Sequence, residues 1–143
     1  MLARMMDQPF AVGDAHVFLE DGGAALPVAV TPTFWRELIT GENRSHGVRQ
    51  IAESTGWLVC ALPKKEDDRG WEMHPAGDEI LYMMSGAVDV VLEYDNVKRL
   101  IPLHEGTACV VPRGTWHRTI TRAPGDMLAI TYGKGTQHRP LGG

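Results

Sequence analysis

Short apolar or alternating segments, separated by polar turns, follow one another from residue 56 to residue 132. They are rich in β-branched and aromatic residues, and glycine, proline, asparagine or aspartate marks the turns between them, as is typical of antiparallel β-strands. The expected strands are residues 57–62, 72–74, 79–85, 88–94, 98–103, 107–111, 115–121 and 127–132. About eight strands at this spacing, with no helix between them, predict an all-β fold of the sandwich or jelly-roll barrel type.

The first 55 residues follow a different pattern. Residues 15–20 and 26–30 have the composition of two strands joined by a glycine-rich turn. Thr31 is expected as a helix N-cap with Pro32 at the first helical position, which predicts a short helix at residues 34–39. Residues 41–54 are polar and are expected to form a loop. We therefore expect one domain with three parts: an N-terminal arm (1–55) that packs on the barrel or on a partner's barrel, the barrel itself (56–135), and a C-terminal tail (136–143).

Composition and charge restrict the partners. The 143 residues carry a net charge of −4, which argues against binding to nucleic acid. No apolar stretch approaches the roughly 20 residues that cross a bilayer, and the N-terminus lacks the pattern of a secretory signal. Cys60 and Cys109 each lie in an apolar segment, as expected of buried thiols in a reducing compartment. We therefore expect a cytoplasmic protein whose partner is a small molecule, not a nucleic acid or a membrane.

Two clusters of side chains that can bind a metal lie in the strand-rich part. In the first, Glu72 and His74 are two residues apart and share one face of an extended strand, and Glu79 begins the next predicted strand. In the second, His117 lies on the predicted strand at residues 115–121. Carboxylates and imidazoles that converge from neighbouring strands suit a divalent transition metal such as iron, manganese, zinc or nickel. Glu72, His74, Glu79 and His117 are therefore the candidate metal ligands.

The spacing of these residues resembles the two motifs of the cupin superfamily. The first motif has His-x-His, a glutamate four or five positions later and a closing glycine, and His74, Glu79 and Gly86 match its second half. The second motif is Gly-x5-Pro-x-Gly-x2-His-x3-Asn. Its glycines, proline and histidine correspond here to Gly106, Pro112, Gly114 and His117. The resemblance covers about a third of the chain and implies a cupin-type jelly-roll β-barrel.

Three positions depart from the family pattern. Glu72 stands in place of the first histidine, Glu66 in place of the leading glycine, and Thr121 in place of the final asparagine. The first departure leaves two readings open: Glu72 joins the site and makes it more anionic than a three-histidine site, or it faces solvent and leaves three ligands. Asp78, which precedes Glu79, is expected to point away from the site.

The resemblance implies either of two classes of function. One is a small metalloenzyme of the dioxygenase, isomerase, lyase or decarboxylase class that acts on a small organic molecule. The other is a non-catalytic barrel that binds or senses a small molecule, since some cupins bind no metal. The resemblance also implies a homodimer, and the apolar strand at residues 15–19 would otherwise be an exposed sheet edge.

The remaining titratable groups give no separate catalytic residue. His16, His46 and His104 are expected to be exposed or locally satisfied. His138 follows the last predicted strand, where it belongs either to a flexible tail or to a lid that contacts substrate. Apart from the ligands, the titratable groups near the motifs are Tyr82, His104 and His138.

Overall fold

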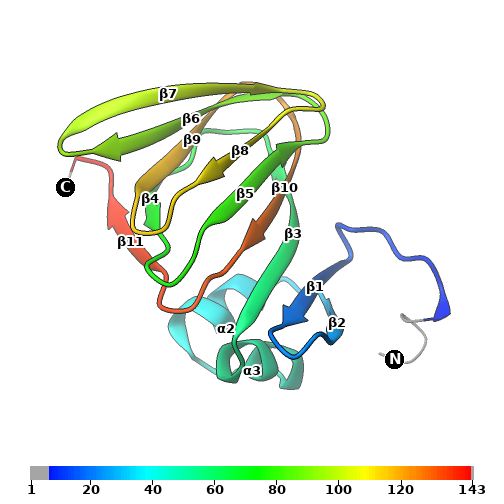
Figure 1. Ribbon diagram of the computed structural model, residues 1–143. Helices are drawn as coiled ribbons and strands as arrows, with labels where there is room; N and C mark the ends of the chain where they lie inside the picture. The colour runs from blue at the N-terminus through cyan, green and yellow to red at the C-terminus, as the bar shows by residue number, and fades with distance from the viewer. Residues whose placement is uncertain (1–6, 143) are drawn as a thin grey trace. The chain divides into compact units, whose positions relative to one another are not determined.

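The computed structural model describes residues 7–142, and the chain divides into two compact units with their boundary between residues 60 and 61. The elements, coloured along the chain in Figure 1, are β1 (Ala15–Glu20), β2 (Ala25–Ala29), α2 (Phe34–Thr40), α3 (His46–Glu53), β3 (Gly56–Lys64), β4 (Gly70–Met73), β5 (Glu79–Met83), β6 (Ala87–Tyr94), β7 (Val97–His104), β8 (Ala108–Val111), β9 (Trp116–Ala123), β10 (Gly125–Thr131) and β11 (Gln137–Pro140). Strand β3 crosses the boundary between the units. Within the described residues no helix is long and apolar enough to cross a membrane.

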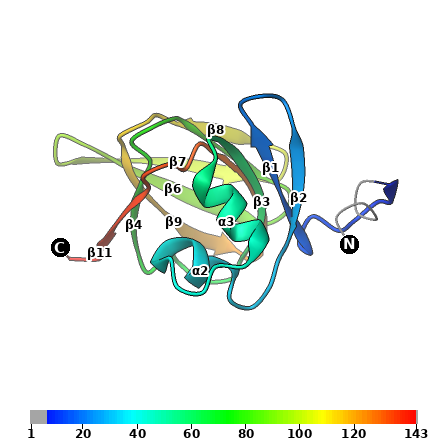
Figure 2. The same cartoon turned by 90° about the horizontal axis from the view of Figure 1, so that it is seen from below.

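The first unit combines an antiparallel sheet with two short helices. Strand β1 pairs with β2 on one side and with β3 on the other, and helices α2 and α3 contact each other (Figure 2). The sequence predicted an exposed edge at β1, and this is wrong because both sides of the strand are paired. The homodimer itself stays a prediction, without that argument in its favour.

Helix α3 occupies part of the segment that the sequence predicted as a loop, and that prediction is wrong. Val48 and Ile51, three residues apart, are both buried, so a single apolar face within a polar segment is enough to dock the helix. The N-cap of α2 also differs from the prediction, since it is Thr33 and not Thr31. The Thr33 hydroxyl donates to the buried Glu37 carboxylate at 2.6 Å.

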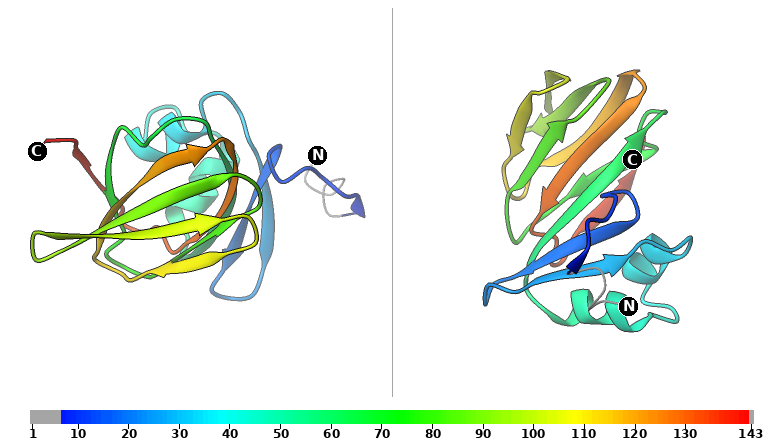
Figure 3. Two further views of the ribbon diagram at one scale, coloured as in Figure 1. Left: turned by 90° about the horizontal axis from the view of Figure 1, so that it is seen from above. Right: turned by 90° about the vertical axis from the view of Figure 1, so that its right-hand side faces the viewer.

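The second unit contains two antiparallel sheets. One has the order β11-β4-β9-β6-β7, and in the other β5 lies between β10 and β8 (Figures 1 and 3). Buried side chains from both sheets form one cluster: Leu81, Met83, Val88, Val90, Leu92, Leu103, Val111, Met127 and Ala129. The sheets therefore face each other across a common core, which confirms the predicted all-β jelly-roll sandwich.

Most of the predicted strands of the second unit are observed within one or two residues of their expected bounds. The C-terminal segment differs from the prediction. Residues 136–143 were expected to form a tail, but Gln137–Pro140 forms β11 and pairs with β4. The physical reason is the free edge that β4 would otherwise present, which this short polar strand covers.

Candidate metal centre

The pairing of β4 places three of the relevant side chains in one row. Glu72 is the direct antiparallel partner of His117 on β9 and of His138 on β11, and directly paired residues point to the same face of a sheet. His117 pairs in turn with the core residue Leu92 of β6. This face is therefore the interior face of the sandwich, with His117 buried and His138 exposed at its margin.

Two hydrogen bonds donated by backbone amides of the second sequence cluster join it to the first. The carbonyl of His74 accepts a hydrogen bond from the amide of Gly114 at 2.9 Å. The Asp78 carboxylate accepts one from the amide of Arg113, also at 2.9 Å. The prediction that Asp78 points away from the site agrees with this contact, because its side chain holds the Arg113–Gly114 turn. The first cluster is thereby fixed against the turn that leads into β9.

The Glu79 carboxylate reaches both histidines. Its Oε1 atom lies 3.0 Å from Nε2 of His117, and its Oε2 atom lies 3.2 Å from Nε2 of His74. Nε2 of His74 is also 3.4 Å from Oε1 of Glu72. The donor atoms of Glu72, His74 and His117 all lie within 4.8 Å of one another. The structure therefore brings together all four residues that the sequence proposed.

The four side chains differ in their exposure. His74, Glu79 and His117 are buried, whereas the side chain of Glu72 is 44% exposed. The cluster is consequently closed on the side of β5 and β9 and open toward solvent beside Glu72. The exposed His138 of β11 lies beside Glu72 on that side.

Hydrogen bonds at Nδ1 determine what each imidazole presents to the site. Nδ1 of His117 lies 3.0 Å from the carbonyl oxygen of Thr115, and a carbonyl can only accept, so Nδ1 carries a proton. In a neutral ring Nε2 then has a lone pair, and it faces Glu79. Nε2 of His74 is likewise buried and has no hydrogen-bond partner, despite the two carboxylates close to it. Lone pairs of nitrogen and oxygen thus converge on one point.

The electrostatics follow from this arrangement. Burial alone would raise the pKa of Glu79, but the adjacent imidazoles of His117 and His74 outweigh it and lower the pKa to about 2. Burial alone would lower the pKa of His117, but the hydrogen bond and charge of Glu79 raise it. Glu72 is partly buried, and this burial together with the charge of Glu79 raises the pKa of its carboxyl despite the nearby imidazoles. Without a cation, the Glu79 carboxylate therefore favours a proton on His117.

The donor set fits a divalent transition metal. Two ligands that bind one ion at about 2.1 Å lie roughly 3.0 Å apart at right angles and roughly 3.4 Å apart at tetrahedral angles. Three of the separations in this cluster fall in or near this range: 3.0 Å from Glu79 to His117, 3.2 Å from Glu79 to His74 and 3.4 Å from Glu72 to His74. Imidazole nitrogens and carboxylate oxygens together suit zinc, iron, manganese and nickel. The unpartnered Nε2 atom of His74 is the group that such an ion would satisfy.

Two threonines near the site were not identified from the sequence. The Thr131 hydroxyl donates to Oε2 of Glu79 at 2.5 Å, and the Thr136 hydroxyl lies 2.7 Å from Nδ1 of His74. The sequence carries no local signal for either contact, because each joins residues more than 50 positions apart through strand pairing. For Thr131 the contact follows from its direct pairing with Glu79 across β10 and β5.

Of the other titratable residues that the sequence singled out, only His138 lies beside the candidate metal ligands. Tyr82 alternates with the buried core residues of β5 and is exposed, and His104 is exposed at the end of β7. His16 is buried, so its predicted exposure or local satisfaction is wrong: both ring nitrogens lack a hydrogen-bond partner. His138 alone lies beside a candidate ligand, across from Glu72.

Comparison with known proteins identifies the same family as the two sequence motifs. A family model described as a cupin domain matches residues 58–132, just over half of the chain. The chain is also 32% identical over 73 residues to the uncharacterized protein L612 of Acanthamoeba polyphaga mimivirus. That match covers 51% of this chain and 45% of the viral protein, so the chain spans less than half of that relative.

Solved structures with a similar fold include two of different kinds. One is a conserved protein of unknown function, SPY1581 from Streptococcus pyogenes, with a TM-score of 0.44 and 23% identity over 55% of this chain and 63% of that one. The other is oxalate decarboxylase from Bacillus subtilis, with a TM-score of 0.49 and 18% identity over 64% of this chain and 25% of that one. At these identities the likeness concerns the fold alone.

Proposed function

The chain belongs to the cupin family, and we propose that it is a metal-dependent member that holds one divalent transition-metal ion. Glu72, His74, Glu79 and His117 would be the ligands. The observation that supports this best is the convergence of two imidazole Nε2 atoms on the Glu79 carboxylate while a neighbouring oxygen occupies each Nδ1. Only protons or a cation can make this arrangement favourable.

We further propose that the ion serves an enzymatic reaction on a small organic molecule, of the dioxygenase, isomerase, lyase or decarboxylase class. A bound ion of this kind supplies a Lewis acid or a redox centre. The chain's own contribution is the asymmetric surroundings: three buried ligands fix the ion, and the half-exposed Glu72 marks the side from which a substrate enters. His138, opposite Glu72, would contact a substrate that enters there.

Metal content, measured by elemental analysis, tests the metal site. The native chain, reconstituted in turn with iron, manganese, nickel and zinc, should retain about one equivalent of at least one ion, as expected for a single site of this kind. His117→Ala should lose the ion, because the substitution removes one of two imidazole ligands. His104→Ala is the matched control, because it removes an exposed histidine of the same unit and should retain the metal. If no ion binds, the metalloenzyme proposal fails and a non-catalytic small-molecule barrel becomes the better account.

A Glu72→Gln variant decides whether Glu72 is a ligand. If its carboxylate binds the ion, the substitution should weaken metal binding by roughly tenfold or more, as expected for the loss of a charged ligand. Unchanged affinity in Glu72→Gln, with affinity lost in His117→Ala, would show instead a three-ligand site. In that case the role of Glu72 would be confined to the entrance.

A further inference from the structure

The Thr136 hydroxyl makes two short contacts whose directions can be assigned. It donates to the carbonyl oxygen of Gly133 at 2.7 Å, and it lies 2.7 Å from Nδ1 of His74. A hydroxyl has one hydrogen, and a carbonyl oxygen can only accept. Since Gly133 takes that hydrogen, the Thr136 oxygen accepts from Nδ1 of His74, and Nδ1 carries a proton.

This assignment fixes the side of the His74 ring that meets the cluster. With the proton at Nδ1, the Nε2 lone pair of a neutral ring points toward the carboxylates of Glu79 and Glu72, at 3.2 and 3.4 Å. The opposite tautomer would leave Nδ1 without a proton for Thr136 and place a hydrogen where a metal ion would bind. Thr136 therefore selects the form of His74 that can act as a ligand.

We propose that Thr136 is a positioning residue of the metal site, which acts through His74 and does not touch the ion. This inference rests on the proposed function. Partners of this kind fix the tautomer and orientation of a ligating histidine, and their loss typically weakens metal binding by about 10- to 100-fold.

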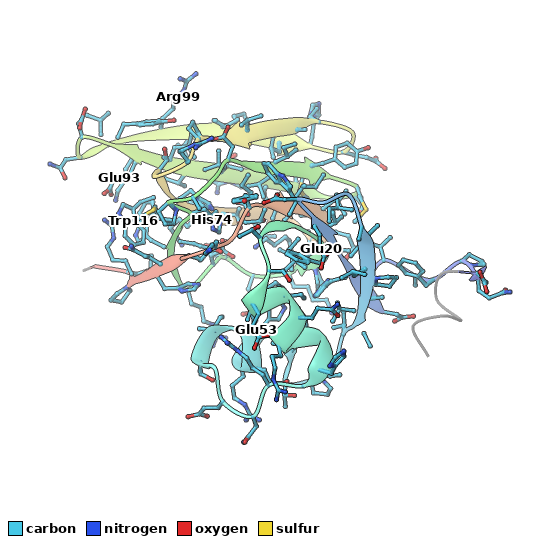
Figure 4. The ribbon with its side chains drawn as sticks, turned by 60° about the horizontal axis from the view of Figure 1, so that its bottom comes forward. Glu20, Glu53, His74, Glu93, Arg99 and Trp116 are labelled. Carbon is cyan, nitrogen blue, oxygen red and sulfur yellow. The ribbon has the colours of Figure 1, made fainter. Side chains whose placement is uncertain are left out.

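The C-terminal strand holds Thr136 in this position. Arg139, on β11, pairs through its two terminal nitrogens with the Glu93 carboxylate at 3.1 and 3.2 Å. Its guanidinium also lies 5.0 Å from the ring centre of Trp71 and 4.8 Å from that of Trp116. Figure 4 shows Glu93, Trp116 and His74 beside the C-terminal strand. The segment that contributes Thr136 is thus anchored on the sheet that carries Glu72 and His117.

Zinc affinity of the full-length chain, measured by competition with a chromogenic chelator, tests the proposal. Thr136→Val keeps the shape of the side chain and removes the hydroxyl, and it should weaken zinc binding by about 10- to 100-fold. Thr136→Ser restores the hydroxyl and should bind within about threefold of the native chain, well inside that range. Thr121→Val is the matched control. It removes another hydroxyl that donates to a carbonyl, that of Glu66, and should leave zinc affinity unchanged.

A second readout does not depend on metal. In the metal-free chain the Nδ1 proton of His74 should give an NMR resonance that exchanges slowly with water in the native protein and in Thr136→Ser. It should be lost through fast exchange in Thr136→Val. Equal exchange in Thr136→Val and the native chain, or equal zinc affinity, would overturn the role of Thr136. A native chain that binds no zinc, or any other ion of the set above, would instead overturn the proposed function.

Discussion

Two buried imidazoles of this chain lie in opposite electrostatic surroundings. Nε2 of His117 faces the Glu79 carboxylate at 3.0 Å, and this contact raises the pKa of the ring. His16 has no polar partner at either nitrogen and lies against Phe34, with ring centres 4.6 Å apart. Burial lowers its pKa. The surroundings of His117 therefore favour a proton or a cation on the imidazole, whereas those of His16 disfavour both.

At His117, a metal ion and a proton compete for the same lone pair. Because the pKa of His117 is raised above 6.5, apparent zinc affinity should fall as the pH drops through that raised value, by up to about tenfold per pH unit for each proton displaced. Competition titrations over about pH 6 to 9 would measure this. Glu79→Gln removes the carboxylate that raises the pKa of His117. The zinc affinity of this variant should be lower than that of the native chain at high pH, but it should begin to fall only at a lower pH. A pH-independent affinity in the native chain would contradict this account.

At His16, the expected pH dependence has the opposite sign. The folded pKa lies below the unfolded value of 6.5, so the unfolded chain binds a proton that the folded chain does not. The contribution of a neutral His16 to stability is complete above about pH 6.5 and declines as the pH falls toward the lowered folded pKa. His16→Phe keeps an aromatic ring against Phe34 and cannot titrate. Its free energy of unfolding should therefore fall less than that of the native chain between about pH 7 and 5.

The quantity to compare is the difference in free energy of unfolding between the native chain and His16→Phe, because other groups titrate in the same pH range. Denaturant unfolding at each pH measures this difference directly. His46→Gln is the control, since His46 is exposed on α3 and its replacement should leave the pH profile unchanged. A His16→Phe profile parallel to that of the native chain would show that His16 does not titrate with folding.

At the scale of elements, the turn into β10 depends on a close approach that only glycine permits. A Cβ atom on Gly125 would lie 2.2 Å from the carbonyl oxygen of Ser85 and 2.6 Å from the amide nitrogen of Gly86. Both are backbone atoms, so the chain itself would have to move. Gly125→Ala should lower the free energy of unfolding by about 1–3 kcal/mol. Gly22→Ala is the control: no atom lies within 4 Å of its added Cβ, and its effect should stay within about 0.5 kcal/mol.

Strand alternation explains why most of the second unit could be predicted and why some elements could not. Burial alternates along β5, with Glu79, Leu81 and Met83 inside. The period-2 alternation of a strand predicts this from the local sequence alone. Helix α3 has only two buried apolar residues within a polar segment, so its pattern is too weak to distinguish from a loop. Thr136 is 62 residues from His74, and only the pairing of β11 with β4 brings them together. Local periodicity carries no information on such a pairing.

At the scale of the whole molecule, the candidate ligands all come from the second unit, while the first unit contributes none of them. An ion that binds only the folded chain stabilises it by about 2.7 kcal/mol when free metal is 100 times the dissociation constant. Zinc should therefore raise the melting temperature. In hydrogen exchange it should slow the amides of β4, β5 and β9 more than those of β1 and β2. His117→Ala should show neither effect. Equal protection of β1 and β2 would mean that the two units open together, and stabilisation by the metal would then be a property of the entire chain.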